Sequence, residues 1–556
     1  MEKKEINRKT NFQRVFLLLS IIAVGLFHEF LSCAASAALC MYLLITARKN
    51  GSIKFKLNIA SVSIILISLF YGLTALWAVD SGMAVIGFFK FLPLPLYMLA
   101  VMQSEEDPIN SLDILPVSIA FMTVISAVLS LIPSLERIFA PAKRLAGFLQ
   151  YSNTYALLAL LALIIAVTKE KIRTADYICI PILVLGIILS GSRICFALTV
   201  ISTIALIVFG KNKKAKIFLS AAAVLTIGAS AVYAAVTDNF ENVGRFLTTS
   251  LNESTFLGRL LYWYDALPII LKNPFGTGYQ GYFYLQSSIQ SGVYTVMYVH
   301  NDFLQLMLDI GFIPTALFIA VTVRSFFKKN AGLKKRLLLF AVSAHCFFDF
   351  DLQFIAVFMI LILLLDFQDG KKIEFKPISF AAASAVCGCL SVYMCISLTA
   401  AYFNNNTLSH ALYPWNTDVN LDILFGSAEP EKIDRNADII IAQNKYVTAA
   451  YSAKADAAFL MGDFTAFMKY KDKAIENSPF AYEEYDGYIL RLLAWIELYT
   501  KAGDLYSADF CRGKLNEVLN KFYSTEDRLS YLGKRIDDQP ITELRTELAE
   551  LIGQYR

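Results

Sequence analysis

The amino-acid sequence predicts an all-α protein, a polytopic membrane helical bundle followed by a second helical domain. Of its 556 residues, 56% are hydrophobic and 17% are charged, against about 25% charged in an average soluble domain. Apolar runs of about 20 residues, the length that crosses a bilayer, recur from Val15 to Ala401 and then stop. We therefore expect a membrane domain at residues 1–401 and a separate domain at residues 402–556.

Comparing each apolar run with the length of a bilayer-crossing helix predicts about thirteen spans. They cover residues 15–30, 31–47, 57–78, 83–102, 113–133, 148–167, 176–191, 194–210, 217–236, 303–323, 337–351, 353–366 and 378–401. As one helix, residues 15–47 would extend about 50 Å, so we expect a hairpin that turns near His28 and Glu29. The basic N-terminus imitates a signal peptide, but the hairpin predicts that it is not cleaved.

The Lys and Arg residues of the connecting segments predict the orientation of the spans. With the N-terminus inside, the inner segments carry 25 of these cations and the outer segments carry 7, and an excess of cations is typical of cytoplasmic loops. We expect a multi-pass protein of the plasma (inner) membrane with a cytoplasmic N-terminus and an extracytoplasmic C-terminal domain. The exception is the inner segment Ser104–Asp113, which is acidic and has no cation.

The C-terminal domain differs from the rest in charge and in pattern. Residues 402–556 carry a net charge of −7, and the remainder carries +11. The pattern matches a tetratricopeptide (TPR) helix hairpin, with a looser copy 41 residues later. Its markers are Gly462, Asp463, Phe464, Ala474 and Pro479, then Gly503, Asp504 and Ala508. We expect a short, degenerate TPR-like domain, and a generic helical bundle is the alternative.

Several classes of site are not expected. Eight of the nine cysteines lie in apolar runs, which favours packing roles and excludes a disulfide framework in the tail. The four histidines are scattered and none accompanies a CxxC pair, so we expect no structural zinc site. We also expect no other metal site and no cofactor. No large basic patch is present, so we expect no nucleic-acid partner.

The long outer loop, residues 237–301, and a short serine-arginine turn contain the cations that suit an anionic substrate. Arg193 lies in the turn Ser190–Arg193, and Arg259 begins an apolar stretch whose part Leu260–Leu271 is expected to form an interfacial helix. The planar guanidinium of arginine donates two hydrogen bonds to phosphate at once. The alternatives are a snorkelling arginine at Arg193 and an interfacial anchor at Arg259. Lys90, within a span, is either functional or snorkelling.

Two histidines are candidates for proton chemistry. His300 opens the run His300-Asn301-Asp302-Phe303-Leu304-Gln305 where the chain enters a span, which suits a general base for an acceptor hydroxyl. A structural, helix-capping histidine is the alternative. His345 precedes Asp349 by four residues, which predicts that the two share a helical face, either on the acceptor side of the site or as a buried structural pair.

Residues 258–313 resemble the core of the bacterial superfamily of O-antigen ligases, O-antigen polymerases and protein O-oligosaccharyltransferases. The matching pieces are Arg259 with Tyr262-Trp263, then Asn273-Pro274-Phe275-Gly276-Thr277-Gly278, then His300 to Gln305 and Gly311, preceded by Ser190-Gly191-Ser192-Arg193. In the protein-glycosylating branch a proline stands where Asp351 follows Phe350 here.

The resemblance implies a metal-independent glycosyltransferase with a GT-C-like fold. Its donor would be an undecaprenyl-pyrophosphate-linked glycan and its acceptor a glycan, lipid or protein. Membrane lipids are further expected partners, and the tail would bind an acceptor or an envelope assembly protein. Arg193 and Arg259 would bind pyrophosphate and His300 would be catalytic. Asn301, Trp263, His345 and Asp349 would contact substrate. The rival hypotheses are a transporter or flippase, which usually shows repeated halves, and a non-catalytic assembly scaffold.

Overall fold

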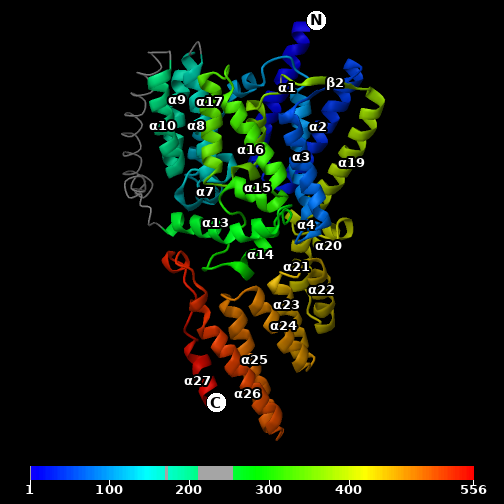
Figure 1. Ribbon diagram of the computed structural model, residues 1–556, viewed down its shortest axis with the longest axis vertical. Helices are drawn as coiled ribbons and strands as arrows, with labels where there is room; N and C mark the ends of the chain where they lie inside the picture. Colours follow the sequence, from blue (N-terminus) through cyan, green and yellow to red (C-terminus); the bar gives the residue numbers. More distant parts are fainter. Residues whose placement is uncertain (1, 170–172, 211–253, 368, 556) are drawn as a thin grey trace. The chain divides into compact units, whose positions relative to one another are not determined.

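The computed structural model describes residues 2–169, 173–210, 254–367 and 369–555, and it is 76% helical (Figure 1). The chain forms two compact units. The first consists of Met1–Leu73, Ile86–Ser250 and His300–Thr399. The second consists of Thr74–Val85, Leu251–Val299 and Ala400–Arg556. The second unit therefore combines the expected C-terminal domain with a short hairpin tip and the outer loop.

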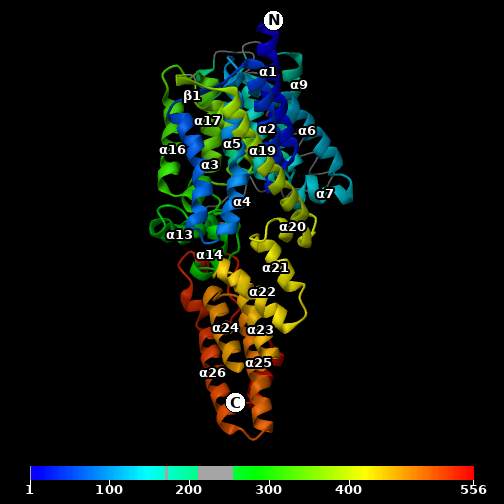
Figure 2. The same ribbon diagram turned by 90° about the vertical axis from the view of Figure 1, so that its right-hand side faces the viewer.

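The first unit is a bundle of helices (Figures 1 and 2). Its helices are α1 (Glu2–Ile22), α2 (Glu29–Asn50), α3 (Ile59–Leu73), α4 (Ser81–Phe91, shared with the second unit), α5 (Pro93–Val101), α6 (Leu115–Leu129), α7 (Pro133–Phe139), α8 (Ser152–Thr168), α9 (Thr174–Ser190), α10 (Arg193–Phe209), α15 (Asp302–Ile310), α16 (Phe312–Phe327), α17 (Leu333–Cys346), α18 (Ile355–Leu364) and α19 (Pro377–Tyr402). Every residue of α18 is buried, and so is nearly every residue of α8. Helices that are apolar on all sides are typical of a protein core or of a membrane span.

Within the described residues, five helices are long and apolar enough to cross a membrane, and six further apolar helices are shorter. The five are Glu29–Asn50, Ile59–Leu76, Ser81–Val101, Pro108–Leu129 and Pro377–Tyr402. These helices make the chain a multi-pass membrane protein, and the count of thirteen spans stays a prediction. The expected span 303–323 is divided at Gly311, where φ is +85°. The expected span 217–236 lies outside the described residues.

The predicted N-terminal hairpin is confirmed. Helix α1 ends at Ile22 and α2 begins at Glu29, and the rings of Phe12 and Tyr42 stack with their centroids 3.5 Å apart. Gly25 in the turn has φ +65°, and a Cβ atom there would lie 2.8 Å from the side chain of Leu149. The turn therefore requires glycine for both its conformation and its packing.

A two-stranded sheet, which the all-α prediction did not include, joins two basic segments of the first unit. Strand β1 (Ile53–Leu57) pairs antiparallel with β2 (Lys371–Phe375), with Ile53 opposite Phe375. Both segments were predicted to be inner, and the ladder places them on the same side of the bundle.

The acidic segment Ser104–Asp113 also finds its cations on that side. Lys54 lies 2.7 Å from Glu105, and Lys334 lies 2.8 Å from Asp113. Both lysines come from other segments that were predicted to be inner. Lysines of neighbouring segments thus neutralise the acidic residues of Ser104–Asp113, which explains why an inner segment can be without cations of its own.

The second unit is helical, and its C-terminal part is built from helical hairpins. Its helices are α13 (Ser254–Lys272), α14 (Gly281–Ile289), α20 (Asn406–Leu412), α21 (Thr417–Phe425), α22 (Pro430–Gln443), α23 (Thr448–Leu460), α24 (Phe464–Asn477), α25 (Tyr482–Lys501), α26 (Leu505–Tyr523) and α27 (Thr546–Tyr555). The turns before α24 and α26 are alike: Gly462 and Gly503 have φ of +76° and +77°. Asp463 and Asp504 then cap the following helices. The predicted repeat of the turn is confirmed, and its TPR identity stays a prediction.

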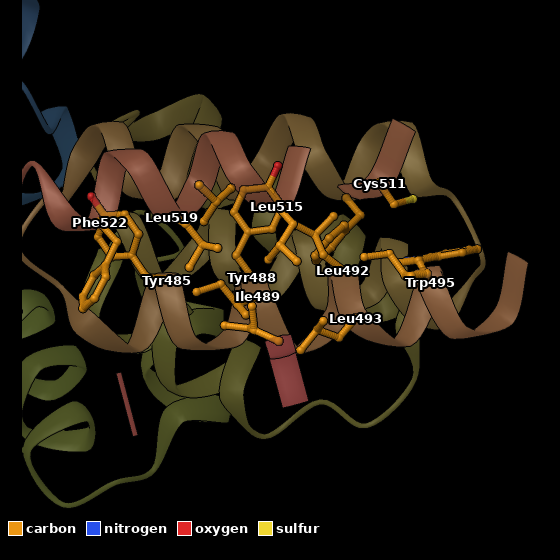
Figure 3. Packing of buried hydrophobic residues seen from close by; sticks show 14 of the residues in the cluster. Tyr485, Tyr488, Ile489, Leu492, Leu493, Trp495, Cys511, Leu515, Leu519 and Phe522 are labelled. Atoms are coloured by element: carbon orange, nitrogen blue, oxygen red, sulfur yellow. The ribbon is translucent and has the colours of Figure 1, made fainter. Parts of the chain in front are cut away.

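The core of this domain lies between α25 and α26 (Figure 3). Buried side chains recur every three or four residues on both helices, as expected for two amphipathic faces in contact. They include Tyr485, Tyr488, Ile489, Leu492 and Ile496 on α25, and Cys511, Leu515, Leu519 and Phe522 on α26. Cys511 is fully buried among apolar side chains, which confirms its packing role, and all nine cysteines are free thiols.

Candidate functional site

His300 lies directly before α15 in a strained backbone conformation. Its φ is +50°, a value that residues other than glycine rarely adopt. Asn301 is extended and caps the helix, because its side-chain oxygen accepts hydrogen bonds from the backbone N–H groups of Phe303 and Leu304. Such strain costs free energy and concentrates at functional sites. The helix cap thus belongs to Asn301, and His300 projects from the strained position beside it.

Asp349 holds the imidazole of His300. The His300 Nδ1 atom lies 3.1 Å from Asp349 Oδ1. The same carboxylate accepts hydrogen bonds from the Tyr151 hydroxyl (2.8 Å), the Asn153 side-chain amide (2.7 Å) and the Phe350 backbone N–H (3.0 Å). The Asp349 side chain is fully buried, whereas that of His300 is 23% exposed. Both carboxylate oxygens therefore have hydrogen-bond partners, which fix the orientation of the Asp349 side chain.

This arrangement determines which nitrogen of His300 can accept a proton. When Nδ1–H donates to Asp349, the neutral ring carries its lone pair on Nε2. The Phe350 ring packs edge-on against the imidazole, with centroids 5.0 Å apart, and fixes its plane. The carboxylate stabilises the imidazolium that forms when Nε2 takes a proton. The pair therefore has the geometry of a general base with its orienting acid.

The serine-arginine turn lies at the junction of two helices in the same unit. Gly191, with φ +61°, ends α9, and Ser192 caps α10. Arg193 is then the first residue of α10. A cation at a helix N-terminus opposes the helix dipole, and an anion beside both would be attracted by the arginine and by the terminal N–H groups. The turn is thus suited to an anionic group of a ligand.

Arg144 connects this turn to the histidine, and sequence reasoning missed it. Its Nε donates to the Ser190 carbonyl oxygen at 2.8 Å, and its Nη2 donates to Asn153 Oδ1 at 2.6 Å. Asn153 in turn donates to Asp349. Tyr151 and Asn153 were missed as well, since no motif marks them in the sequence. The only signal at Arg144 was its charge in an outer segment, which Arg137 and Lys143 share.

The expected pairing of His345 with Asp349 is wrong. Helix α17 ends at Cys346, so Asp349 lies beyond the helix and the spacing of four residues no longer brings the two together. His345 Nδ1 lies 2.5 Å from Asp351 Oδ2 instead, and Thr154 donates to the other Asp351 oxygen at 2.7 Å. Both His345 and Asp351 are fully buried. This agrees with the structural alternative for His345.

One buried group among the described residues has the composition of a metal site. Carboxylate or thiol atoms of Asp302, Cys346 and Asp351 lie within 4.8 Å of one another. Both Asp351 oxygens already accept hydrogen bonds, and one oxygen of Asp302 accepts from the Leu352 backbone N–H at 2.9 Å. Hydrogen bonds thus occupy both oxygens of Asp351 and one oxygen of Asp302, as in a buried polar core.

Arg259 and Trp263 belong to the second unit, on α13. The Trp263 indole N–H donates to the Val299 carbonyl oxygen at 3.0 Å and so holds the end of the outer loop. Arg259 is half-buried and close enough to Tyr262 to oppose the rise that burial causes in the pKa of that phenol.

A further residue of α13, Asp265, also escaped the sequence analysis. It accepts hydrogen bonds from Ser291 and from the Tyr294 hydroxyl, at 2.7 to 2.9 Å. It therefore ties α13 to the chain that follows α14.

A comparison with known families covers the segment that carries most of the motifs. No curated protein matches the chain. Residues 178–319 match a family model described as O-antigen ligase, and this segment contains Arg193, Arg259 and His300. Tyr151, Asn153 and Asp349, which complete the histidine site, lie outside the matched segment. Residues 178–319 are therefore similar to the O-antigen ligase family, in agreement with the resemblance drawn from the motifs.

Proposed function

We propose that this protein transfers or polymerises an undecaprenyl-pyrophosphate-linked glycan at the outer face of the plasma membrane, in the biosynthesis of cell-surface polysaccharide. The observation that carries the proposal is the buried Asp349 carboxylate that holds Nδ1 of a partly exposed His300. The hydrogen-bond path from this pair through Asn153 and Arg144 to the Ser190–Arg193 turn supplies a cationic neighbourhood.

The reaction follows from these groups. The acceptor hydroxyl oxygen attacks the anomeric carbon of the donor, and His300 Nε2 takes the hydroxyl proton. The bond between the anomeric carbon and the pyrophosphate oxygen breaks, and undecaprenyl pyrophosphate leaves with the electron pair. Arg193 and Arg259 bind the pyrophosphate and stabilise the negative charge that grows on it. Asp349 stabilises the imidazolium until the proton is released to water.

In this proposal the enzyme is metal-independent, because arginines supply the positive charge at the leaving group. Two guanidinium groups can each donate a pair of hydrogen bonds to pyrophosphate oxygens. The proposal predicts that a metal chelator leaves transfer unchanged, while replacement of Arg193 by alanine abolishes it.

The orientation is part of the proposal. The strand pairing and the ion pairs of Lys54 and Lys334 join segments that were predicted to be inner. Placing these basic segments in the cytoplasm follows the positive-inside rule. The serine-arginine turn and the outer loop then face outward, where the tail would meet an acceptor or an assembly protein.

Mass spectrometry of polyprenyl-pyrophosphate-linked glycans in cells tests the proposal. Cells carrying His300→Ala are compared, at matched expression, with cells carrying the natural protein and with cells carrying His410→Ala. His410 is a suitable control because it is half-buried and hydrogen-bonded to Asn420 within the C-terminal part, at 2.9 Å.

The products separate the hypotheses. Accumulated single repeat units indicate a polymerase, and long lipid-linked chains with loss of a conjugate indicate a ligase. An unchanged lipid-linked pool in the His300→Ala cells would remove His300 from the mechanism and favour the transporter or the scaffold. The control variant is expected to match the natural protein.

A further inference from the structure

Helix α13 of the second unit carries an exposed apolar face on its C-terminal half. Tyr264, Leu267 and Leu271 follow one another at three- and four-residue spacing, so they lie on one side of the helix. Their exposed fractions are 57%, 48% and 72%. Phe275, just beyond the helix, is also exposed. Lys272 is the single charged residue of this stretch from Tyr264 to Phe275 besides the buried Asp265.

The N-terminal half of the same helix is covered by protein. Leu257 and Leu261 are buried against Tyr294 and Ile536, in a small apolar cluster of the second unit. On the inner side of the C-terminal half, Asp265 accepts its hydrogen bonds from Ser291 and Tyr294. The helix is therefore held firmly by the second unit, and its exposed face does not result from loose packing.

The exposed face continues onto the end of a membrane span. The apolar helix Ile59–Leu76 has 18 residues, about 27 Å of helix, close to the hydrocarbon thickness of a bilayer. Leu76 and Trp77 at its end are exposed, and tryptophan is typical of the membrane-water interface at the ends of spans. The rings of Trp77 and Phe275 meet edge to face, with centroids 6.4 Å apart.

The turn after α13 makes close, specific contacts with the segment Thr74–Val85, the hairpin tip of the second unit. The Val79 backbone N–H donates to the Thr277 carbonyl oxygen at 2.9 Å. Gly278 has φ +85°, and a Cβ atom there would lie 2.5 Å from the Ala78 Cβ atom. Only glycine allows this approach. The turn is thus attached to the residues that directly follow the apolar helix Ile59–Leu76.

We infer that the C-terminal half of α13 lies in the lipid headgroup layer, with Tyr264, Leu267, Leu271 and Phe275 facing the acyl chains. The occupant of this face is the bilayer itself. Lys272 beside it would reach lipid phosphate, as lysine does at interfaces. Trp77 and Phe275 continue the same surface to the span, so that helix and hairpin tip form one membrane-contacting surface.

This position would give α13 a further role that rests on the proposed function. Arg259 lies on the same helix, and the pyrophosphate of a lipid-linked donor lies at headgroup depth. A helix attached to the bilayer surface would keep that arginine at the depth of the group it binds. The position of the helix is nevertheless testable without any transfer reaction.

The test uses the full chain in nanodiscs whose lipids carry bromine, a quencher of indole fluorescence, either near the carbonyl or near the end of the acyl chain. In a Trp77→Phe background, Leu271→Trp adds an indole at the proposed surface, and its signal is the difference from the Trp77→Phe parent, which keeps Trp263, Trp415 and Trp495. Leu505→Trp is the matched control, because Leu505 is exposed at the start of α26 in the C-terminal hairpins. Leu267→Trp provides a second position should Leu271→Trp fold poorly.

We expect the indole of Leu271→Trp to be quenched more by bromine near the carbonyl than by bromine near the chain end. The indole added in the control is expected to show no quenching. Red-shifted, unquenched emission from Leu271→Trp would mean that water covers the face, and blue-shifted, unquenched emission would mean that protein covers it. Either result overturns the inference. Adding His300→Ala would leave the quenching unchanged, so failure of the catalytic proposal and failure of this inference are distinguishable.

Discussion

Replacing Asp349 by asparagine changes the candidate site at a single oxygen. The carboxylate accepts hydrogen bonds from Tyr151, the Phe350 backbone N–H and His300 on Oδ1, and from Asn153 on Oδ2. An asparagine at this position keeps one oxygen, which can still accept from Tyr151, the Phe350 N–H and His300, and its NH₂ group then faces the side-chain NH₂ group of Asn153. Asn153 cannot rotate its amide in response, because its own oxygen accepts from Arg144 at 2.6 Å. One donor therefore meets another, and the charge beside His300 is lost.

The size of the effect follows from these contacts. A hydrogen bond to a charged group contributes about 1.5–3 kcal/mol, and about 1.4 kcal/mol corresponds to a tenfold change in rate. Loss of the charge that stabilises the imidazolium should lower transfer roughly 10- to 150-fold. The unsatisfied donor should also cost about 1–3 kcal/mol of stability. Both effects are small enough to leave a folded protein to measure.

The assay is transfer from purified lipid-linked glycan by the full chain in nanodiscs, accompanied by thermal unfolding. Asp351→Asn is the matched control, because it changes the same turn and pairs with His345 instead of His300. We expect it to lower stability to a similar degree while retaining much more activity than Asp349→Asn. Full activity of Asp349→Asn, or an equal loss of activity in both variants, would refute the proposed orientation of His300.

Three further predictions test other parts of the structure. Arg144→Lys keeps the charge but cannot donate to both Ser190 and Asn153 as the guanidinium does, so the transfer rate should fall about tenfold. The control Arg324→Lys, on the exposed surface of α16, should leave the transfer rate unchanged. Equal activity of the two variants would contradict the role of Arg144. Gly278→Ala should lower the free energy of unfolding, measured by denaturant titration, by about 1–3 kcal/mol. Gly462→Ala should lower it less. Both glycines have positive φ, but no atom lies within 4 Å of a Cβ atom built at Gly462. Burial raises the pKa of Asp265 above its ordinary value of 3.8, so its contribution to stability is full at pH values below that value and is lost as the pH rises through the raised pKa in the folded state. Thermal unfolding across this range should show a smaller fall with rising pH in Asp265→Asn than in the natural protein, and identical profiles would rule out this assignment.

Much of the candidate site could be predicted because its parts are short and local. The Ser190–Arg193 turn was recognised as a run of four residues, and the structure confirms a turn between two helices. His300 was recognised from the run that follows it, and the structure gives that run as a capped helix entry. Asp349 was assigned to the site on the wrong grounds. The four-residue spacing to His345 suggested a shared helical face, but α17 ends at Cys346, before Asp349. The histidine that Asp349 contacts is His300.

The sequence by itself determined the membrane character, the helical class, the repeated turns of the tail and the order of the site motifs. Hydropathy, helix caps and short motifs act over a few residues, so they can be read without a fold. Only the tertiary structure decided which carboxylate meets which histidine, that Arg144 joins the site, and that two basic segments pair as strands. His300 and Asp349 are 49 residues apart, and Asn153 and Asp349 are 196 apart. Contacts over such separations depend on how helices pack and where they end, which no local spacing encodes.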